Sequence, residues 1–139
     1  MCSKLFLPHL RNSRGCITNM ASMNGFFVEP SCAGYCATKG GIIALTMAMT
    51  IDHGKDGIRV NCICPGYINA GLSWEYFEAQ PNPAEARKSA GTLHALGRVG
   101  QPEEVARLAV FLASDDASFI TGSAVVVSGG FGIGLPPLG

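Results

Sequence analysis

At 139 residues the chain has the length of one domain, and 47% of its residues are hydrophobic, an ordinary fraction for a globular fold. Its ten basic and ten acidic residues cancel, and no basic cluster indicates nucleic-acid binding. The richest apolar segment, residues 42–51, is too short to span a membrane, and residues 1–8 lack the apolar core of a secretory signal. We therefore predict a soluble, cytoplasmic protein.

The six cysteines and three histidines do not form a recognisable metal site. None of the cysteines occurs in a Cys-x-x-Cys pair, and the histidines are scattered along the chain. Small, buried free thiols in a cytosolic protein account for all six cysteines. We therefore predict no bound metal.

The first elements along the chain are the end of a helix and a short strand. Residues 4–10 have a helical pattern, which we expect Pro8 to close. Residues 16–20 are typical of a short apolar strand. Turn-forming residues then predict a loop over residues 22–33.

A long helical pattern covers residues 34–53. Its adjacent glycines, Gly40 and Gly41, each cost about 1 kcal/mol relative to alanine in a helix interior. We expect another helix or chain to pack closely against them. A second strand follows over residues 58–64, and a Pro-Gly pair ends it.

Residues 72–92 predict two short helices in a long excursion, which is typical of a lid over a substrate. Trp74, Tyr76 and Phe77 suggest that this lid faces an apolar pocket, although aromatic residues in such loops pack as often on their own domain. Another helix begins at Pro102, because proline favours the first helical position and the two acids after it suit the positive end of the helix dipole.

The last predicted elements are a strand and a flexible tail. Residues 124–127 form an apolar run of the kind that is buried on both faces of a sheet, and the glycine-rich residues 129–134 follow. Strands alternating with helices predict an α/β fold with a parallel sheet of three strands. No glycine-rich phosphate-binding turn follows a strand, so residues 1–139 are expected to form a single, partial domain.

The chemistry centres on Tyr35 and Lys39, four residues apart near the start of the long helix. That spacing places both side chains on one face of a helix, with Cβ atoms about 5–6 Å apart. An ammonium group so close favours the phenolate form of a tyrosine and lowers its pKa toward the range useful for acid–base catalysis. Ser22 could then hold the substrate oxygen beside the tyrosine.

The same spacing has an ordinary structural explanation. A Tyr-x-x-x-Lys pair on a helix is most often a half-buried aromatic ring beneath a solvated cation. The pair alone therefore does not identify an enzyme, and the accompanying motifs must decide between the two interpretations.

Further segments accompany the pair in a fixed order, with Ser22 thirteen residues before Tyr35. Together they resemble the C-terminal half of a short-chain dehydrogenase/reductase, from about residue 4 to residue 130. The resemblance implies half of a doubly wound, Rossmann-like parallel sheet. The matching segments are Leu7-Pro8, Asn19 with Ser22, Tyr35 to Gly41, Gly57 to Asn61, Pro65-Gly66, Gly97-Arg98, Pro102 to Ala106, Phe111 to Ser114 and Thr121-Gly122.

The resemblance assigns catalytic roles to three residues. Tyr35 would exchange a proton with the substrate oxygen, and Ser22 would position that oxygen. Lys39 would lower the pKa of the tyrosine and hold the ribose of the nicotinamide. Asn61 is expected to shape the sheet rather than contact a ligand.

The resemblance also implies a nicotinamide cofactor. Tyr35, Lys39, Pro65, Gly66 and Ile68 match its contacts, with Ile68 contributing its backbone. The residues that select NAD or NADP belong to the first half of such a sheet, which this chain lacks, so either cofactor is expected. Where the family usually has threonine after the Pro-Gly pair, this chain has alanine, which removes one hydroxyl contact.

We therefore expect an NAD(P)-dependent oxidoreductase that transfers hydride between nicotinamide and a small alcohol or carbonyl substrate. A full-length form is expected to be a homo-dimer or homo-tetramer. The alternative is a non-catalytic, truncated homologue that acts through self-association or partner binding. An upstream glycine-rich strand–turn–helix would favour the enzyme, and a genuine start at Met1 would favour the alternative.

Overall fold

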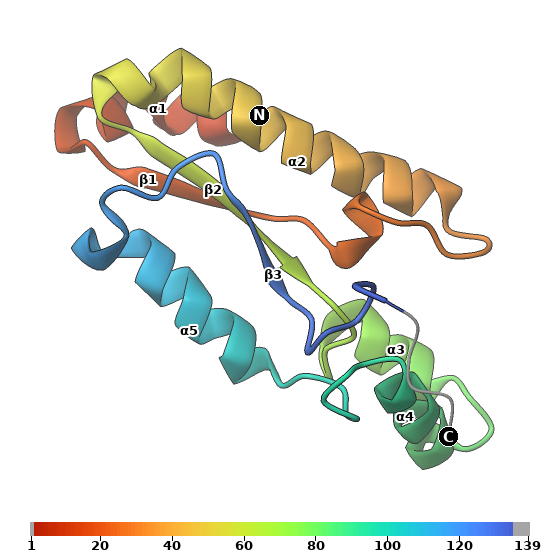
Figure 1. The fold of residues 1–139 in the computed structure, drawn as a ribbon. Coiled ribbons are helices and arrows are strands. Elements are labelled where there is room, and N and C mark those ends of the chain that lie inside the picture. The colour runs from red at the N-terminus through yellow and green to blue at the C-terminus, as the bar shows by residue number, and fades with distance from the viewer. Residues whose placement is uncertain (1, 135–139) are drawn as a thin grey trace.

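The structure is a computed structural model that describes residues 2–134. Its elements are α1 (Cys2–Ser13), β1 (Cys16–Met20), α2 (Ala33–His53), β2 (Arg59–Pro65), α3 (Gly71–Glu78), α4 (Pro83–Thr92), α5 (Pro102–Ala113) and β3 (Ala124–Val127). Helices α1 and α2 lie on one face of the sheet and α5 lies on the other (Figure 1). Helices α3 and α4 lie beyond the carboxyl ends of the strands (Figure 1).

The predicted α/β fold with a three-stranded parallel sheet is confirmed. Strands β1 and β3 have the predicted bounds, and β2 is shifted by one residue. The strand order is β1-β2-β3, with Met20 opposite Ile63 and Pro65 opposite Val127. The strands therefore end at one edge of the sheet, the edge at which open α/β sheets bind ligands.

The central strand, β2, is buried by helices on both faces. The side chains of Cys62, Ile63 and Cys64 are fully inaccessible to solvent. Cys62 and Cys64 pack with Ile43 of α2 on one face, and Ile63 packs with Leu112 of α5 on the other. Burial of each such aliphatic side chain contributes about 1.5–3 kcal/mol, so β2 anchors both layers of helices.

The prediction that Pro8 closes the first helix is wrong, because α1 continues through it to Ser13. A proline inside a helix removes one backbone hydrogen bond. Leu7 and Leu10, on either side of the proline, pack against a buried cluster that includes Met49 of α2. This packing offsets the lost hydrogen bond and keeps the helix continuous.

The prediction that residues 124–127 are buried on both faces is wrong at Val126. Val125 and Val127 pack in the cluster beneath α5, whereas Val126 on the opposite face is 43% exposed. In the described structure β3 is an edge strand, and α2 packs on β1 and β2. No helix therefore covers Val126.

The five cysteines between residues 2 and 134 whose side chains are described are free thiols, but they are not all buried. Cys36, Cys62 and Cys64 are buried, and Cys16 and Cys32 are half-buried. Burial raises the pKa of the Cys64 thiol to about 12, so the thiol stays protonated and unreactive. In the same part of the chain, no group of three or more His, Cys, Asp and Glu side chains is arranged to hold a metal ion.

No second helix of the described chain packs closely against Gly40 and Gly41. A Cβ atom added at Gly40 would lie 3.6 Å from the carbonyl oxygen of Gly25, which is an ordinary contact. A Cβ atom added at Gly41 would meet no described atom within 4 Å. The glycine pair therefore leaves part of the outer surface of α2 open.

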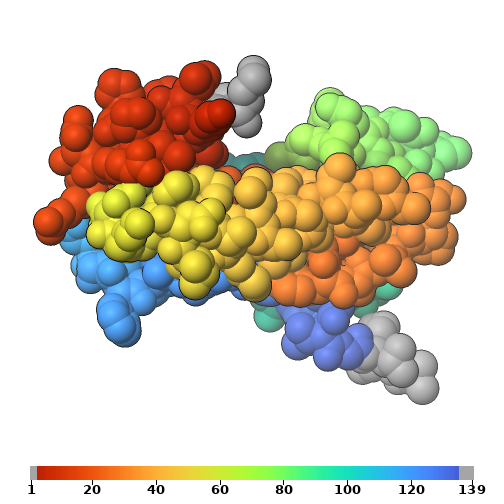
Figure 2. Space-filling model, turned by 90° about the horizontal axis from the view of Figure 1, so that it is seen from above, coloured from red at the N-terminus to blue at the C-terminus, as the bar shows by residue number. Residues whose placement is uncertain are grey.

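The outer face of α2 is turned toward the viewer in Figure 2. It carries apolar side chains that are open to solvent. Leu45, Met47 and Ile51 are 52%, 48% and 83% exposed. Among the described residues, β1 also has no strand partner on its outer side. Exposed apolar faces and open strand edges both favour association between chains. None of the helices in residues 2–134 is long and apolar enough to cross a membrane.

We predict that residues 1–139, produced alone, self-associate because of this apolar face and open edge. Size-exclusion chromatography with light scattering measures the mass. Ile51→Lys should raise the monomer fraction, because it places a charge on the outer face of α2. Phe119→Lys is the matched control, since Phe119 is also open to solvent but lies outside α2. A monodisperse monomer for the unaltered chain would contradict the prediction.

Candidate active site

A pocket of about 540 Å³ opens at the carboxyl ends of β1 and β2. Its walls come from the turn after β1, the loop and first turn of α2, the segment after β2 and helix α3. Three of the predicted site residues, Ser22, Tyr35 and Gly66, line this pocket. The other lining residues are Asn24, Glu29, Pro30, Cys32, Tyr67, Leu72, Ser73, Tyr76 and Phe131.

Ser22 follows β1 and caps the short 3-10 turn Met23–Gly25. Its Oγ accepts a hydrogen bond of 3.2 Å from the backbone N–H of Asn24, and its side chain is buried. Because the oxygen acts as acceptor in this contact, the hydroxyl hydrogen remains available to a ligand. Ser22 can therefore donate a hydrogen bond to a substrate oxygen in the pocket.

Gly25 allows this turn to lie directly on α2. A Cβ atom at Gly25 would lie 2.6 Å from Cδ1 of Ile43 and 3.0 Å from the backbone carbonyl oxygen of Lys39. A side chain at Gly25 would force the Ile43 methyl to move and would crowd the backbone of Lys39, so glycine favours this close approach. The contact brings Ser22 to the helix that carries Tyr35.

Tyr35 and Lys39 lie on the same face of α2, as the spacing predicted. The Nζ atom of Lys39 is 5.4 Å from the centre of the Tyr35 ring, and the Tyr35 side chain is partly exposed at the pocket wall. Nζ also donates a hydrogen bond of 3.0 Å to the carbonyl oxygen of Met20 at the end of β1. An ammonium group has three N–H donors, so this bond fixes Lys39 beside the ring and leaves two donors for a ligand.

Gly66 lies at the end of β2, directly after Pro65, and donates a backbone hydrogen bond of 3.0 Å to Val127. A Cβ atom at Gly66 would lie 3.1 Å from both Nε2 of His94 and Cα of Ser128. The tight packing beneath the pocket therefore favours glycine at this position. Pro65 ends the strand and does not line the pocket.

Ile68 lies outside this pocket, in a parallel bridge with Gly100. The bridge uses the carbonyl oxygen of Tyr67 and the N–H of Asn69, each 2.9 Å from its partner atom in Gly100. In this pairing the N–H of Ile68 itself points away from Gly100. No described residue accepts a hydrogen bond from it, so it is available for a backbone contact.

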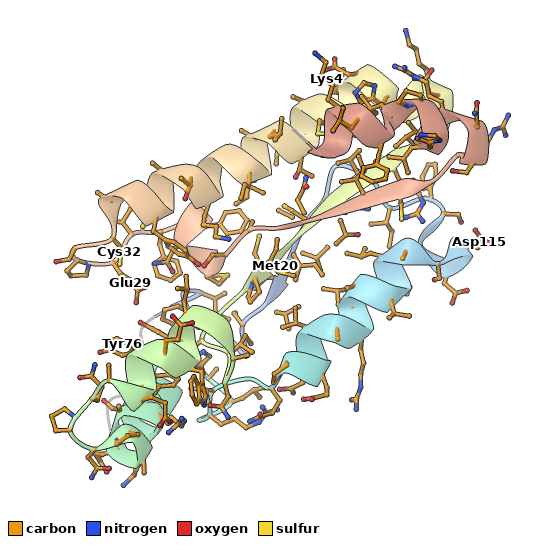
Figure 3. The ribbon with its side chains drawn as sticks, turned by 180° about the vertical axis from the view of Figure 1, so that it is seen from behind. Lys4, Met20, Glu29, Cys32, Tyr76 and Asp115 are labelled. Atoms are coloured by element: carbon orange, nitrogen blue, oxygen red, sulfur yellow. The ribbon has the colours of Figure 1, made fainter. Side chains whose placement is uncertain are left out.

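The structure adds a polar network that the sequence analysis missed. Glu29, in the loop before α2, accepts a hydrogen bond of 2.9 Å from Oη of Tyr67 and one of 2.7 Å from Nδ2 of Asn24. All three side chains line the pocket. Glu29 lies on the side of its loop that faces Tyr76 of α3 (Figure 3).

A signal for Glu29 is present in the sequence. It is the only acidic residue among residues 1–51, and it lies between Ser22 and Tyr35. An isolated carboxylate between two candidate catalytic residues could have been included in the site. Its partner Tyr67 is 38 positions away along the chain, and no periodicity links residues so far apart.

The phenol of Tyr67 is held in its protonated form. Burial raises its pKa above the ordinary value, and the hydrogen bond to the Glu29 carboxylate raises it further. Ionisation would remove the donated proton and place a second negative charge beside Glu29. Tyr67 therefore acts as a hydrogen-bond donor that orients the carboxylate.

The predicted lid is confirmed only in part. The two predicted short helices are present as α3, which begins one residue earlier than predicted, and α4, and Tyr76 lines the pocket. Phe77 is instead fully buried in a cluster with Ala90 of α4, and Trp74 does not line the pocket. A short helix must bury one face against a neighbour to be stable, and Phe77 provides that face for α3.

The prediction of a flexible tail is wrong for residues 129–132. The three glycines in this segment have φ angles of 55°, 86° and 78°, in the left-handed region that favours glycine. The resulting turns bring Phe131 into the pocket wall. Its ring centre lies 4.9 Å from that of Phe27 and 5.4 Å from that of Tyr67.

A family model and several known proteins match nearly the whole of this chain. The family model described as enoyl-(acyl carrier protein) reductase matches residues 1–132. Meso-2,3-butanediol dehydrogenase of Serratia marcescens is 46% identical over 129 residues, which are 93% of this chain and 49% of that protein. L-fucose dehydrogenase of Mus musculus is 48% identical over 132 residues, which are 94% of this chain and 48% of that protein.

A solved structure supports the same relationship. The structure of 4-hydroxyisoleucine dehydrogenase complexed with NADH superimposes with a TM-score of 0.83 at 38% identity. The match covers 96% of this chain and 54% of the other. The chain thus spans about half the length of the proteins it matches.

We predict that Tyr67 does not ionise between about pH 9 and pH 11, where a free tyrosine does. The tyrosinate absorbance that develops in this range should therefore be the same in the unaltered chain and in Tyr67→Phe. Ultraviolet titration of both proteins measures it. A smaller rise in Tyr67→Phe would show that the phenol ionises normally and is not held by burial and Glu29.

Proposed function

This chain belongs to the short-chain dehydrogenase/reductase family, and on that basis we propose that it supplies the catalytic half of an NAD(P)-dependent oxidoreductase of alcohols and ketones. One observation carries the proposal: Ser22 and Tyr35 line the same pocket, with the Lys39 ammonium beside the tyrosine ring. The similarity to dehydrogenases of a diol and of a sugar supports an alcohol as the substrate.

In the direction of oxidation, Tyr35 as phenolate accepts the proton of the substrate hydroxyl. The positive charge of Lys39 favours that phenolate. Ser22 donates a hydrogen bond to the same substrate oxygen and stabilises the negative charge that develops on it. In the direction of reduction, Tyr35 returns its proton to the carbonyl oxygen, so one group serves as base and as acid.

A bound nicotinamide nucleotide would take up or supply the hydride at the substrate carbon. The residues of this chain fit its nicotinamide end, to which we assign Tyr35, Lys39, Pro65, Gly66 and Ile68. Lys39 has two N–H donors left for ribose hydroxyls, and Ile68 has an available backbone N–H. In this proposal either NAD or NADP serves as the cofactor.

We further propose that the complete protein is a homo-dimer or homo-tetramer. The exposed apolar face of α2 supports this assembly. The alternative of a non-catalytic homologue is not favoured, because the relatives are named as dehydrogenases and this chain has Ser22, Tyr35 and Lys39 together.

Activity is best tested in a protein that places residues 1–139 after a dinucleotide-binding first half. That half can be the corresponding half of the Serratia marcescens relative. In this protein Tyr35→Phe should lower kcat by about 10⁴-fold, the upper end for an acid–base group. Cofactor affinity, measured by calorimetry, should change little, because the variant removes one hydroxyl group.

Tyr76→Phe is the matched control, because Tyr76 lines the same pocket without a neighbouring lysine. It should leave kcat within a few-fold of the unaltered protein. If Tyr35→Phe also kept kcat within a few-fold, Tyr35 would have no part in proton transfer.

Ser22→Ala should reduce kcat by about 10²–10³-fold, the effect of losing one donor to a developing oxyanion. The loss is smaller than for Tyr35→Phe because the serine positions the oxygen and transfers no proton. Ser73→Ala changes another serine of the pocket wall and should have little effect. A loss as severe as that of Tyr35→Phe would require a more direct chemical role for Ser22.

A further inference from the structure

The pocket contains a carboxylate that the proposed chemistry does not use. Glu29 lines it together with Ser22 and Tyr35. We propose, resting on the function proposed above, that Glu29 determines substrate specificity by binding a second hydroxyl group of the substrate. The protein then acts on neutral diols and polyols, and it rejects hydroxy acids.

The carboxylate is oriented by donors from two separate parts of the chain. Oη of Tyr67 donates to Oε1 over 2.9 Å, and Nδ2 of Asn24 donates to Oε2 over 2.7 Å. Asn24 is buried, and the Tyr67 ring packs near Phe131 and Phe77. Because packing holds both donors, Glu29 is placed before a substrate arrives, which is the condition for a specific polar contact.

The hydrogen-bonding capacity of Glu29 is only half used by these contacts. An ionised carboxylate has about four lone-pair sites and accepts hydrogen bonds without donating any. Tyr67 and Asn24 occupy one site on each oxygen. A ligand that fills the pocket must therefore offer its own donor to Glu29, and a hydroxyl group provides one.

The rest of the pocket wall disfavours substrates that carry an apolar group or a carboxylate in place of the second hydroxyl. Its apolar part includes Pro30, Leu72 and Phe131, which cannot satisfy the carboxylate when water is displaced. The described lining residues include no lysine, arginine or histidine. A substrate carboxylate would thus face Glu29 without a lining cation to compensate it, and like charges repel in a poorly solvated site.

Asn24 connects the two polar ends of the pocket. Its backbone N–H bonds to Oγ of Ser22, and its side-chain amide bonds to Glu29. One residue therefore sets the position of the group that holds the reacting oxygen and of the group that would hold the second hydroxyl. A single substrate with two hydroxyl groups can engage both.

Three substrates that differ at one carbon test the proposal. Propane-1,2-diol, propan-2-ol and lactate share a methyl carbinol and carry a hydroxymethyl, a methyl and a carboxylate group beside it. In the two-half protein described above, kcat/KM should be about tenfold or more higher for the diol than for propan-2-ol, the effect of one hydrogen bond to a charged group. Lactate should be the poorest of the three.

Glu29→Gln tests whether the carboxylate causes these differences. The amide oxygen can still accept from Asn24, and the amide nitrogen can donate to the Tyr67 hydroxyl, so both supporting contacts are kept. The ratio of diol to propan-2-ol should fall about five- to tenfold, because a neutral group forms the weaker hydrogen bond. The ratio of lactate to propan-2-ol should rise about tenfold or more, because the repulsion is removed.

Glu75→Gln is the matched control, since it removes the same charge from α3 at a residue that does not line the pocket. It should leave both ratios unchanged.

The proposal is overturned if the unaltered protein uses lactate as well as the diol, which needs no variant to measure. It is also overturned if folded Glu29→Gln keeps both ratios. Turnover of none of the three alcohols would overturn the proposed function itself, and this inference with it.

Discussion

The candidate site depends on the contact between the turn Met23–Gly25 and helix α2. The turn lies so close to the helix that a side chain at Gly25 would displace Ile43 and crowd the backbone of Lys39. This contact brings Ser22, which follows one strand, beside Tyr35, which opens the next helix. The Lys39 ammonium adds a second tie from the same helix to the end of β1. Two contacts, at Gly25 and at Lys39, therefore hold the segment after β1 on α2.

Strand β2 supplies the other side of the pocket, and it can do so because it is buried on both faces. A strand held by α2 on one face and α5 on the other has little freedom to shift. Gly66 and Tyr67 follow the strand directly, so the buried strand fixes where they lie in the pocket wall. Phe131, returned by the glycine turns after β3, packs on the Tyr67 ring and closes the wall. Loops carry the chemistry here, and the strands fix where those loops start.

The Glu29 carboxylate shows how the pocket combines specificity with stability. A carboxylate that is partly removed from water costs free energy unless hydrogen bonds compensate it. Tyr67 and Asn24 provide that compensation, and the high pKa of Tyr67 keeps its proton in place for the purpose. In our proposal the remaining acceptor capacity binds a hydroxyl group of the substrate. A charged group retained at such a cost in a pocket wall is better explained by recognition than by stability.

The sequence by itself determined the three strands, the long helix and the spacing that puts Tyr35 and Lys39 on one face, because these features depend on local periodicity. Tertiary structure decided the rest. Pro8 stays inside α1 because Leu7 and Leu10 are buried, and Phe131 is ordered because glycine turns return it to the core. The bond from Tyr67 to Glu29 joins residues 38 positions apart. Contacts between segments so far apart leave no periodic trace in a single sequence, so only the folded chain could place Glu29 beside Ser22 and Tyr35.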